Sequence, residues 1–165
     1  MTKPLLFKSL VDILYFLHVI GLLGILIIIP LGVVNINQVN MDVKDWSSLS
    51  FSIAIISVSA YIIFLRGLYF LRKMAGFLVS NKYFSELIIK RLKKSGVHFS
   101  LAGILSLVII FLAWIGKLYD GKLELIYDLN LMIPLFLMII GLFFIIQSEA
   151  LLVAKNFKEE NELTV

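Results

Sequence analysis

The sequence has no cysteine among its 165 residues, and only 16% of them are charged. The first absence excludes a disulfide framework, a thiol nucleophile and a thiolate metal site. The second sets the chain apart from soluble domains, in which charged residues make up about 25% and apolar ones about 45–50%. Here the hydrophobic fraction is 61% and the mean hydropathy is +1.02. The composition therefore predicts one integral membrane domain.

Catalytic and metal-binding motifs are also missing. The sequence contains no P-loop, no G-x-S-x-G and no H-E-x-x-H, which are the usual signs of nucleotide, acyl-transfer and zinc chemistry. Its two histidines cannot easily meet, because His18 lies deep in the first apolar segment and His98 lies at the start of the third. We interpret His18 as a neutral, hydrogen-bonded histidine near the middle of the membrane. The sequence thus predicts a protein that is not an enzyme and that holds no cofactor or metal.

Four apolar segments are long enough to cross a bilayer, which takes about 20 helical residues. They cover about residues 10–34, 49–71, 97–115 and 131–154. Their apolar runs are too continuous for barrel strands, so helices must satisfy the backbone polar groups. No A-x-A-like cleavage site follows the first segment, and we interpret it as a retained anchor. The predicted fold is all-α: a four-helix transmembrane bundle.

The distribution of lysine and arginine predicts the orientation of this bundle, because cytoplasmic loops carry an excess of both. Three cations fall on one side: Lys44, Lys117 and Lys122. Twelve fall at or near the other: Lys3, Lys8, Arg66, Arg72, Lys73, Lys82, Lys90, Arg91, Lys93, Lys94, Lys155 and Lys158. We therefore expect both termini to be cytoplasmic.

Five polar residues lie inside the predicted spans, where charges are costly. They are Asp12, His18, Arg66, Gln147 and Glu149. At a rise of 1.5 Å per residue, Asp12, Arg66 and Glu149 come out at similar depths on three helices. This predicts an intramembrane cluster of the three, with Gln147 nearby. It would act either as a structural clamp, with Arg66 free to extend toward the surface, or as a cation or proton site.

Two spans carry regularly spaced small or polar residues. In the second span they recur every seven positions, at Ser52, Ser59, Arg66 and Lys73. In the third they are Gly96, Ser100 and Gly103, a spacing that lets two helix backbones approach closely. Packing within the bundle and formation of a homo-oligomer are both compatible with this pattern.

The segment between the second and third spans carries seven cations and one acid, Glu86. Within it, residues 85–95 are predicted to form a short amphipathic helix, with Ser85 as its N-cap and Gly96 at its end. Such a helix would lie in the membrane interface. Its cations, which include Lys93 and Lys94, would contact anionic lipid headgroups. It could equally bind an acidic protein partner. Nothing in the segment resembles a recognition helix, so we expect no direct contact with nucleic acid.

The last residues, 155–165, form an acidic tail on the same predicted side. From Asn156 onward, Glu159, Glu160 and Glu162 outnumber Lys158. We predict that this tail folds back onto the basic segment as a reversible latch, since exposed ion pairs are each worth only about 0–1 kcal/mol. A solvated, frayed terminus is the alternative.

The tail FKEENELTV and the basic segment NKYFSELIIKRLKKSG resemble a bacterial membrane-protein family known as domain of unknown function 2975. The resemblance implies four spans in a bacterial inner membrane and no assigned activity. It also implies a possible partner, because genes of this family often stand beside small helix-turn-helix regulators. Tyr83, Ala154 and Lys155 depart from the expected pattern, which has a proline in place of Tyr83 and a glycine near the other two.

The leading hypothesis is a non-enzymatic inner-membrane protein that docks or sequesters a cytoplasmic partner such as a helix-turn-helix regulator. Two alternatives remain: a transporter or exporter subunit that uses Asp12, Arg66, Glu149 and His18, and a protein conferring immunity to a toxin. The residues assigned to partner binding or to the latch are Asn81, Phe84, Ser85, Arg91, Lys93, Lys94, Glu159, Glu160, Glu162 and Thr164.

Overall fold

Four long helices make up almost all of the structure. The computed structural model describes residues 3–28, 35–36, 39–40, 48–80, 85–119 and 129–163. The helices are α1 (Lys3–Ile28), α2 (Ser48–Val79), α3 (Glu86–Tyr119) and α4 (Leu129–Leu163). Two short antiparallel strands, β1 (Asn35–Ile36) and β2 (Val39–Asn40), pair Asn35 with Asn40 and Ile36 with Val39. Each helix is long and apolar enough to cross a membrane, which confirms the predicted all-α class and its four spans.

The helices are longer than the predicted spans. With 32, 34 and 35 residues, α2, α3 and α4 are about 48–52 Å long, whereas the hydrocarbon core is about 30 Å thick. The extra turns lie mainly at the end that holds the start of α1, the end of α2, the start of α3 and the end of α4. The predicted spans stopped where charges begin, but lysine, arginine and glutamate are good helix formers. The helices therefore continue through them.

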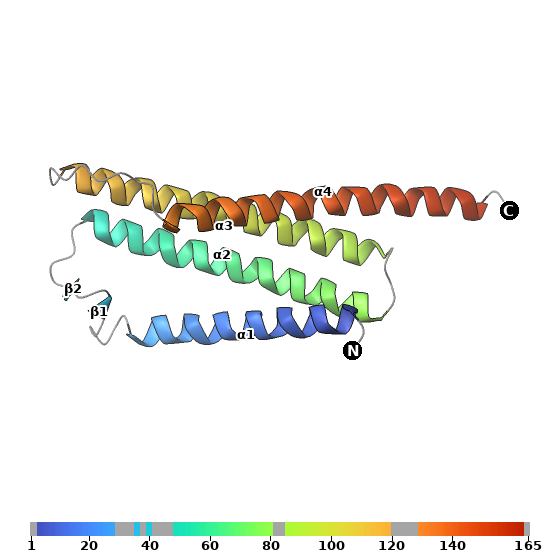
Figure 1. Ribbon diagram of the computed structural model, residues 1–165, viewed down its shortest axis with the longest axis horizontal. Coiled ribbons are helices and arrows are strands. Elements are labelled where there is room, and N and C mark those ends of the chain that lie inside the picture. The colour runs from blue at the N-terminus through green and yellow to red at the C-terminus, as the bar shows by residue number, and fades with distance from the viewer. Residues whose placement is uncertain are drawn as a thin grey trace.

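The helices are arranged in a row that follows the order of the chain (Figure 1). Among the described residues, close backbone approaches join α1 to α2, α2 to α3 and α3 to α4, and none joins α1 to α4. The predicted bundle would need that last contact to close. Within the described part of the chain, α1 therefore packs on one neighbour only, and Val11 is its one buried apolar residue.

The hydrophobic core lies between α2 and α3. Leu68 and Ile88 are each 1% exposed, and Leu92 and Phe99 are buried in the same cluster. Burying such side chains contributes about 1.5–3 kcal/mol each. Ser95 lies at this interface, fully buried, and donates its hydroxyl to the carbonyl of Gly67 at 2.9 Å. The long α2–α3 hairpin is thus the central unit of the fold.

The predicted short amphipathic helix over residues 85–95 is wrong as a separate element. Ser85 does cap a helix, because the amide of Ile88 donates to its Oγ at 3.3 Å, but that helix is α3 itself and continues to Tyr119. The apolar face containing Ile88 and Leu92 is real, yet it packs on α2 beside Met74. Since α2 already covers this face, the bilayer is not needed to bury it.

The small residues of the third span serve the contact between α3 and α4. A Cβ added at Gly96 would lie 2.5 Å from the carbonyl oxygen of Gly141, and one at Gly103 would lie 2.8 Å from that of Pro134. Ser100 also contacts Gly141 directly. The prediction that Gly96 ends a helix is wrong, because α3 continues through it. Gly96 instead permits this close approach. The stripe of small residues therefore has a role in packing within one chain.

Candidate functional site

Charged side chains gather at one end of the row. We call this the basic end and define it as residues 3–12, 71–80, 86–96 and 150–163. All four helices contribute to it, since the chain enters and leaves the row there (Figure 1). Many of its cations lie beside aromatic rings: the guanidinium of Arg91 is 5.5 Å from the centre of Phe77, and the ammonium of Lys94 is 5.4 Å from that of Phe70. Such contacts hold cations in place without neutralising them.

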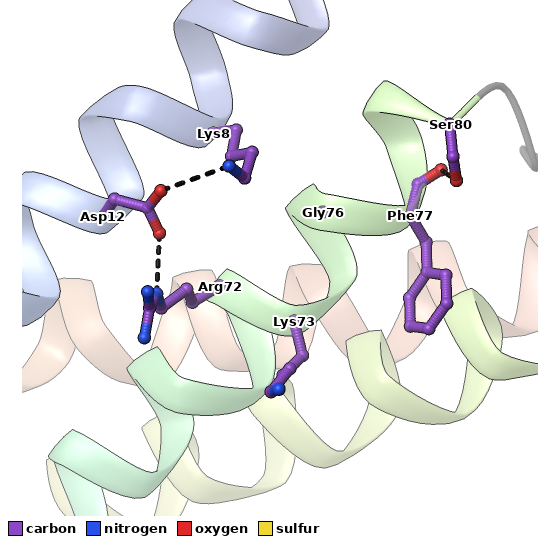
Figure 2. A pocket seen from close by; sticks show the side chains of 7 residues that line it. All are labelled: Lys8, Asp12, Arg72, Lys73, Gly76, Phe77 and Ser80. Atoms are coloured by element: carbon purple, nitrogen blue, oxygen red, sulfur yellow. Dashed lines mark hydrogen bonds and ion pairs between the residues drawn. The ribbon is translucent and has the colours of Figure 1, made fainter.

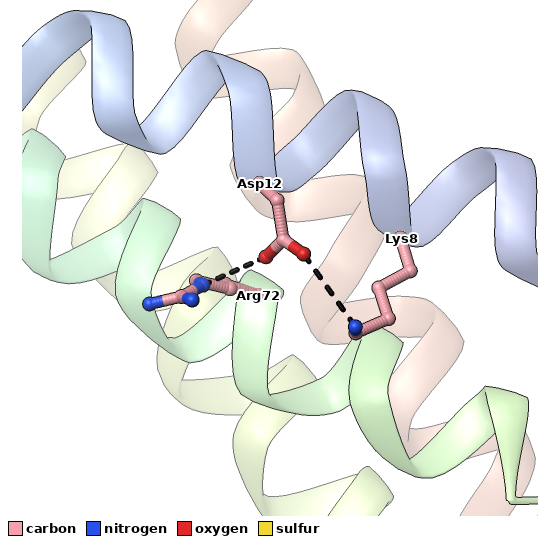
Figure 3. Close-up of polar contacts among 3 residues, drawn as sticks. All are labelled: Lys8, Asp12 and Arg72. Atoms are coloured by element: carbon pink, nitrogen blue, oxygen red, sulfur yellow. Dashed lines mark hydrogen bonds and ion pairs between the residues drawn. The ribbon is translucent and has the colours of Figure 1, made fainter.

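A network of three charges joins α1 to α2 (Figure 3). Arg72 donates its Nε hydrogen to Asp12 Oδ1 at 2.7 Å, and the ammonium of Lys8 lies 3.6 Å from Asp12 Oδ2. The guanidinium of Arg72 also covers the rings of Phe16 and Tyr15, at 4.8 and 5.3 Å. The side chains of Asp12 and Arg72 are 24% and 34% exposed. This partial burial makes the pair stronger than a fully solvated one.

The predicted cluster of Asp12, Arg66 and Glu149 does not form. Asp12 pairs with Arg72 instead of Arg66, while Glu149 pairs with Lys93 of α3 at 3.5 Å. Arg66 and Gln147 are exposed on α2 and α4. The reason is the register of α1: Val11 is buried in the cluster that contains Leu68 and Leu71, so Asp12 falls beside Arg72.

His18 lies on α1, half-buried against α2 and apart from the charged groups of the basic end. The Nδ1 of His18 is 2.8 Å from the carbonyl of Leu14. The hydroxyl of Tyr61 donates to the backbone carbonyl of His18 at 3.0 Å. The ring of Phe64 lies 5.1 Å away. The imidazole is hydrogen-bonded, as expected, and helps to fix the contact between α1 and α2. Within the described residues, no group of three or more potential ligands could hold a metal ion.

The acidic tail continues α4 as a helix to Leu163, and it does not fold back as a latch. Two ion pairs lie along it, each four residues apart: Lys155 with Glu159 at 3.4 Å and Lys158 with Glu162 at 3.5 Å. This spacing stabilises a helix by about 0.2–0.5 kcal/mol per pair. Figure 1 shows the end of α4 extending beyond the other three helices.

The other predicted partner-binding residues divide into three groups. Ser85 is the cap of α3, and Arg91 is half-buried, with an Nε that has no hydrogen-bond partner in the described part of the chain. Lys93 and Lys94 are exposed on α3. Asn81, Phe84 and Thr164 lie outside the described residues.

Sequence reasoning missed Arg72 as the partner of Asp12. It also missed a pocket of about 410 Å³ between α1 and α2, which includes Arg72 and Lys73 in its lining. One signal was available: Lys8 and Asp12 are four residues apart, the spacing that joins two side chains on one helix face. The partner on α2 had no such signal, since it depends on how the two helices are aligned.

The comparisons with known proteins give one match. The model of the family described as "Protein of unknown function (DUF2975)" matches residues 34–165, which confirms the resemblance found in the tail and the basic segment. The match includes α2, α3 and α4, and α1 precedes it. No curated protein and no solved structure matches the chain.

Proposed function

Because the chain belongs to the DUF2975 family of proteins of unknown function, which transfers no activity to it, we propose a function from the geometry. The protein is a non-enzymatic inner-membrane protein that holds a basic cytoplasmic partner on the projecting end of α4. The excess of cations at the basic end makes that end cytoplasmic.

One observation carries the proposal: α4 projects as a helix beyond the rest of the chain (Figure 1). Counted from Leu131, where the candidate span begins, about 20 residues cross the hydrocarbon core and end near Ala150. The helix continues for a further 13 residues, 151–163. Phe157, in this extension, is 61% exposed, and Val153 one turn earlier is 53% exposed. A contiguous apolar surface exposed to water, such as two neighbouring large side chains can form, marks an interaction site.

The charge of the extension indicates the chemistry of the partner. Residues 151–163 carry Glu159, Glu160 and Glu162 against Lys155 and Lys158, a net charge of −1. DNA-binding proteins carry a basic face for phosphate contacts, so an acidic helix with an apolar anchor would compete with DNA for that face. Sequestration of a helix-turn-helix regulator is the form of the proposal that agrees with the family resemblance.

The test is purification of the full chain from its native membranes in a mild detergent, followed by mass spectrometry. Two variants remove the proposed contacts: Phe157→Ala, and the triple charge reversal Glu159→Lys, Glu160→Lys and Glu162→Lys. We expect a DNA-binding protein with the full chain and its loss with either variant. Mutation of a central anchor in an interface costs about 2 kcal/mol or more, which corresponds to about a thirtyfold weaker complex.

The matched control is Phe143→Ala. Phe143 is also on α4 and 53% exposed, but it lies 14 residues earlier, among the about 20 residues counted from Leu131 that cross the hydrocarbon core. Retention of the partner by this variant and its loss by Phe157→Ala would support docking on the extension. Equal retention by all variants, or recovery of the full chain alone, would contradict the proposal.

A further inference from the structure

One opening at the basic end is the pocket between α1 and α2 (Figure 2). Its volume of about 410 Å³ is within the usual range of about 300–1,000 Å³ for small-molecule sites. The lining residues are Lys8, Asp12, Arg72, Lys73, Gly76, Phe77 and Ser80. Two helices thus contribute three cations and one carboxylate to a single cavity.

The charges of this pocket do not balance. Asp12 is its one carboxylate, and it already interacts with both Arg72 and Lys8. The ammonium of Lys73 lies 5.6 Å from the centre of the Tyr69 ring, and no described carboxylate pairs with it. The lining therefore keeps a net charge of +2, which favours an anionic ligand.

Arg72 has donors left for such a ligand. Its hydrogen bond to Asp12 uses Nε, while a guanidinium has five N–H donors in a planar fork. This fork matches the oxygens of a phosphate group. The contact with Phe16 on one face of the guanidinium fixes its plane. Arg72 is thus oriented by α1 while it retains unused donors.

Gly76 gives the pocket its room. A Cβ added at this position would meet no atom within 4 Å, so the α2 backbone lines the cavity without obstruction. The depth of the pocket is also suitable: Arg72 directly follows the second predicted span. Phosphate groups of lipids lie at this level of a bilayer, just outside its hydrocarbon core.

We propose that the pocket formed by Lys8, Arg72, Lys73 and Gly76 binds a phosphate group, with Arg72 and Lys73 as its main ligands. The same chemistry would accept the headgroup of an anionic phospholipid or a soluble phosphate. This site differs from the proposed docking surface, because it lies on α1 and α2 and uses no residue of α4.

The absence of native cysteine allows a direct test of occupancy. The variant Gly76→Cys places one thiol in the pocket, where the structure has space for it. In an uncharged detergent, we would measure its rate of reaction with a maleimide while adding dioctanoyl phosphatidic acid, dioctanoyl phosphatidylcholine or inorganic phosphate. Lys94→Cys, exposed on α3, is the control thiol.

We expect phosphatidic acid to protect the Gly76→Cys thiol and leave the Lys94→Cys thiol unaffected. Protection by phosphatidic acid alone identifies a lipid headgroup as the ligand, and equal protection by inorganic phosphate identifies a soluble phosphate. The added substitutions Lys8→Gln and Lys73→Gln should weaken protection by about tenfold or more. The control substitutions Lys155→Gln and Lys158→Gln, on α4, should leave it unchanged.

Three results would overturn the proposal. They are no protection by any phosphate compound, equal protection by the zwitterionic phosphatidylcholine, and protection that survives the loss of Lys8 and Lys73. The first would mean an empty pocket, the second a site for acyl chains, and the third an anion bound elsewhere. A variant that fails to fold would show altered reactivity at Lys94→Cys as well, which separates misfolding from loss of the ligand.

Discussion

Arg72 Nε donates to Asp12 Oδ1 at 2.7 Å, and this bond links α2 to α1, a helix outside the segment matched by the family model. Few other polar contacts hold α1: the described ones include the bond from Tyr61 to the carbonyl of His18. Since Val11 is the only buried apolar residue of α1 among those whose burial the structure describes, the Asp12–Arg72 pair has a large share in keeping this helix in register.

The variant Asp12→Asn should therefore loosen α1. The amide keeps the size of the carboxylate but removes its charge, leaving Lys8 and Arg72 as neighbouring cations. We expect a loss of about 1 kcal/mol or somewhat more, measured as a lower midpoint of thermal unfolding in mild detergent. Glu149→Gln is the control, because the Glu149–Lys93 pair is 61% and 55% exposed. A larger shift for Glu149→Gln than for Asp12→Asn would contradict this ranking.

Gly141→Ala should destabilise the contact between α3 and α4. A Cβ at this position would lie 2.6 Å from the amide nitrogen of Ser100 and 2.7 Å from the carbonyl oxygen of Gly96, so the helices must separate. Overpacking of this kind costs about 1–3 kcal/mol. Gly24→Ala, where the added atom meets nothing within 4 Å, should be neutral or slightly stabilising. Gly141→Ala should lower the midpoint of unfolding, whereas Gly24→Ala should leave it unchanged or raise it slightly. Equal midpoints for the two variants would contradict the close approach of α3 and α4.

Ile88→Ala should cost about 2–4 kcal/mol, because Ile88 is 1% exposed between α2 and α3. The neighbouring variant Leu87→Ala should cost about 1 kcal/mol or less, since Leu87 is 50% exposed. A separate helix lying in the membrane interface would bury both side chains in lipid and make the two substitutions similar. Chemical or thermal unfolding of the two variants distinguishes these arrangements.

The orientation of the row can be tested with single cysteines in whole cells. Phe157→Cys, exposed on the α4 extension, should react with a membrane-impermeant maleimide only after the cells are permeabilised. Asp45→Cys, in the predicted external segment, should react in intact cells. Reaction of Phe157→Cys in intact cells would reverse the assigned orientation and exclude a cytoplasmic partner on α4.

The sequence predicted what depends on local pattern. The four spans follow from length and hydropathy, and the capping role of Ser85 and the close approach at Gly96, Ser100 and Gly103 follow from residue type and spacing. The partner of Asp12 could not be predicted in this way. The depth of a residue in the membrane was counted from the end of its own span, and this count does not say how two helices are aligned. Val11 sets that alignment through its burial in the cluster that also contains Leu68, a residue 57 positions away in the sequence.

The continuity of α3 was missed for a related reason. Ile88 and Leu92 of the predicted apolar face are buried, but α2 covers them where the sequence predicts lipid. Lipid and a second helix would both bury the same amphipathic pattern of apolar residues. Only the length of α2, which continues to Val79, decides between them. The tail was likewise predicted from charge alone, whereas its lysine–glutamate spacing also favours a continued helix.

The burial of Ile88 and Leu92 against α2 has a thermodynamic consequence. These residues lie beyond residues 97–115, the part of α3 that the sequence predicts to cross the bilayer, so we expect their core to form in water, where apolar burial itself drives folding. Deeper in the membrane that driving force is missing, and helices associate through close packing alone. The two ends of the α2–α3 hairpin should therefore respond to different conditions. The packing at the aqueous end should weaken in urea and on cooling, while the packing at the lipid-embedded end should depend on the surrounding bilayer.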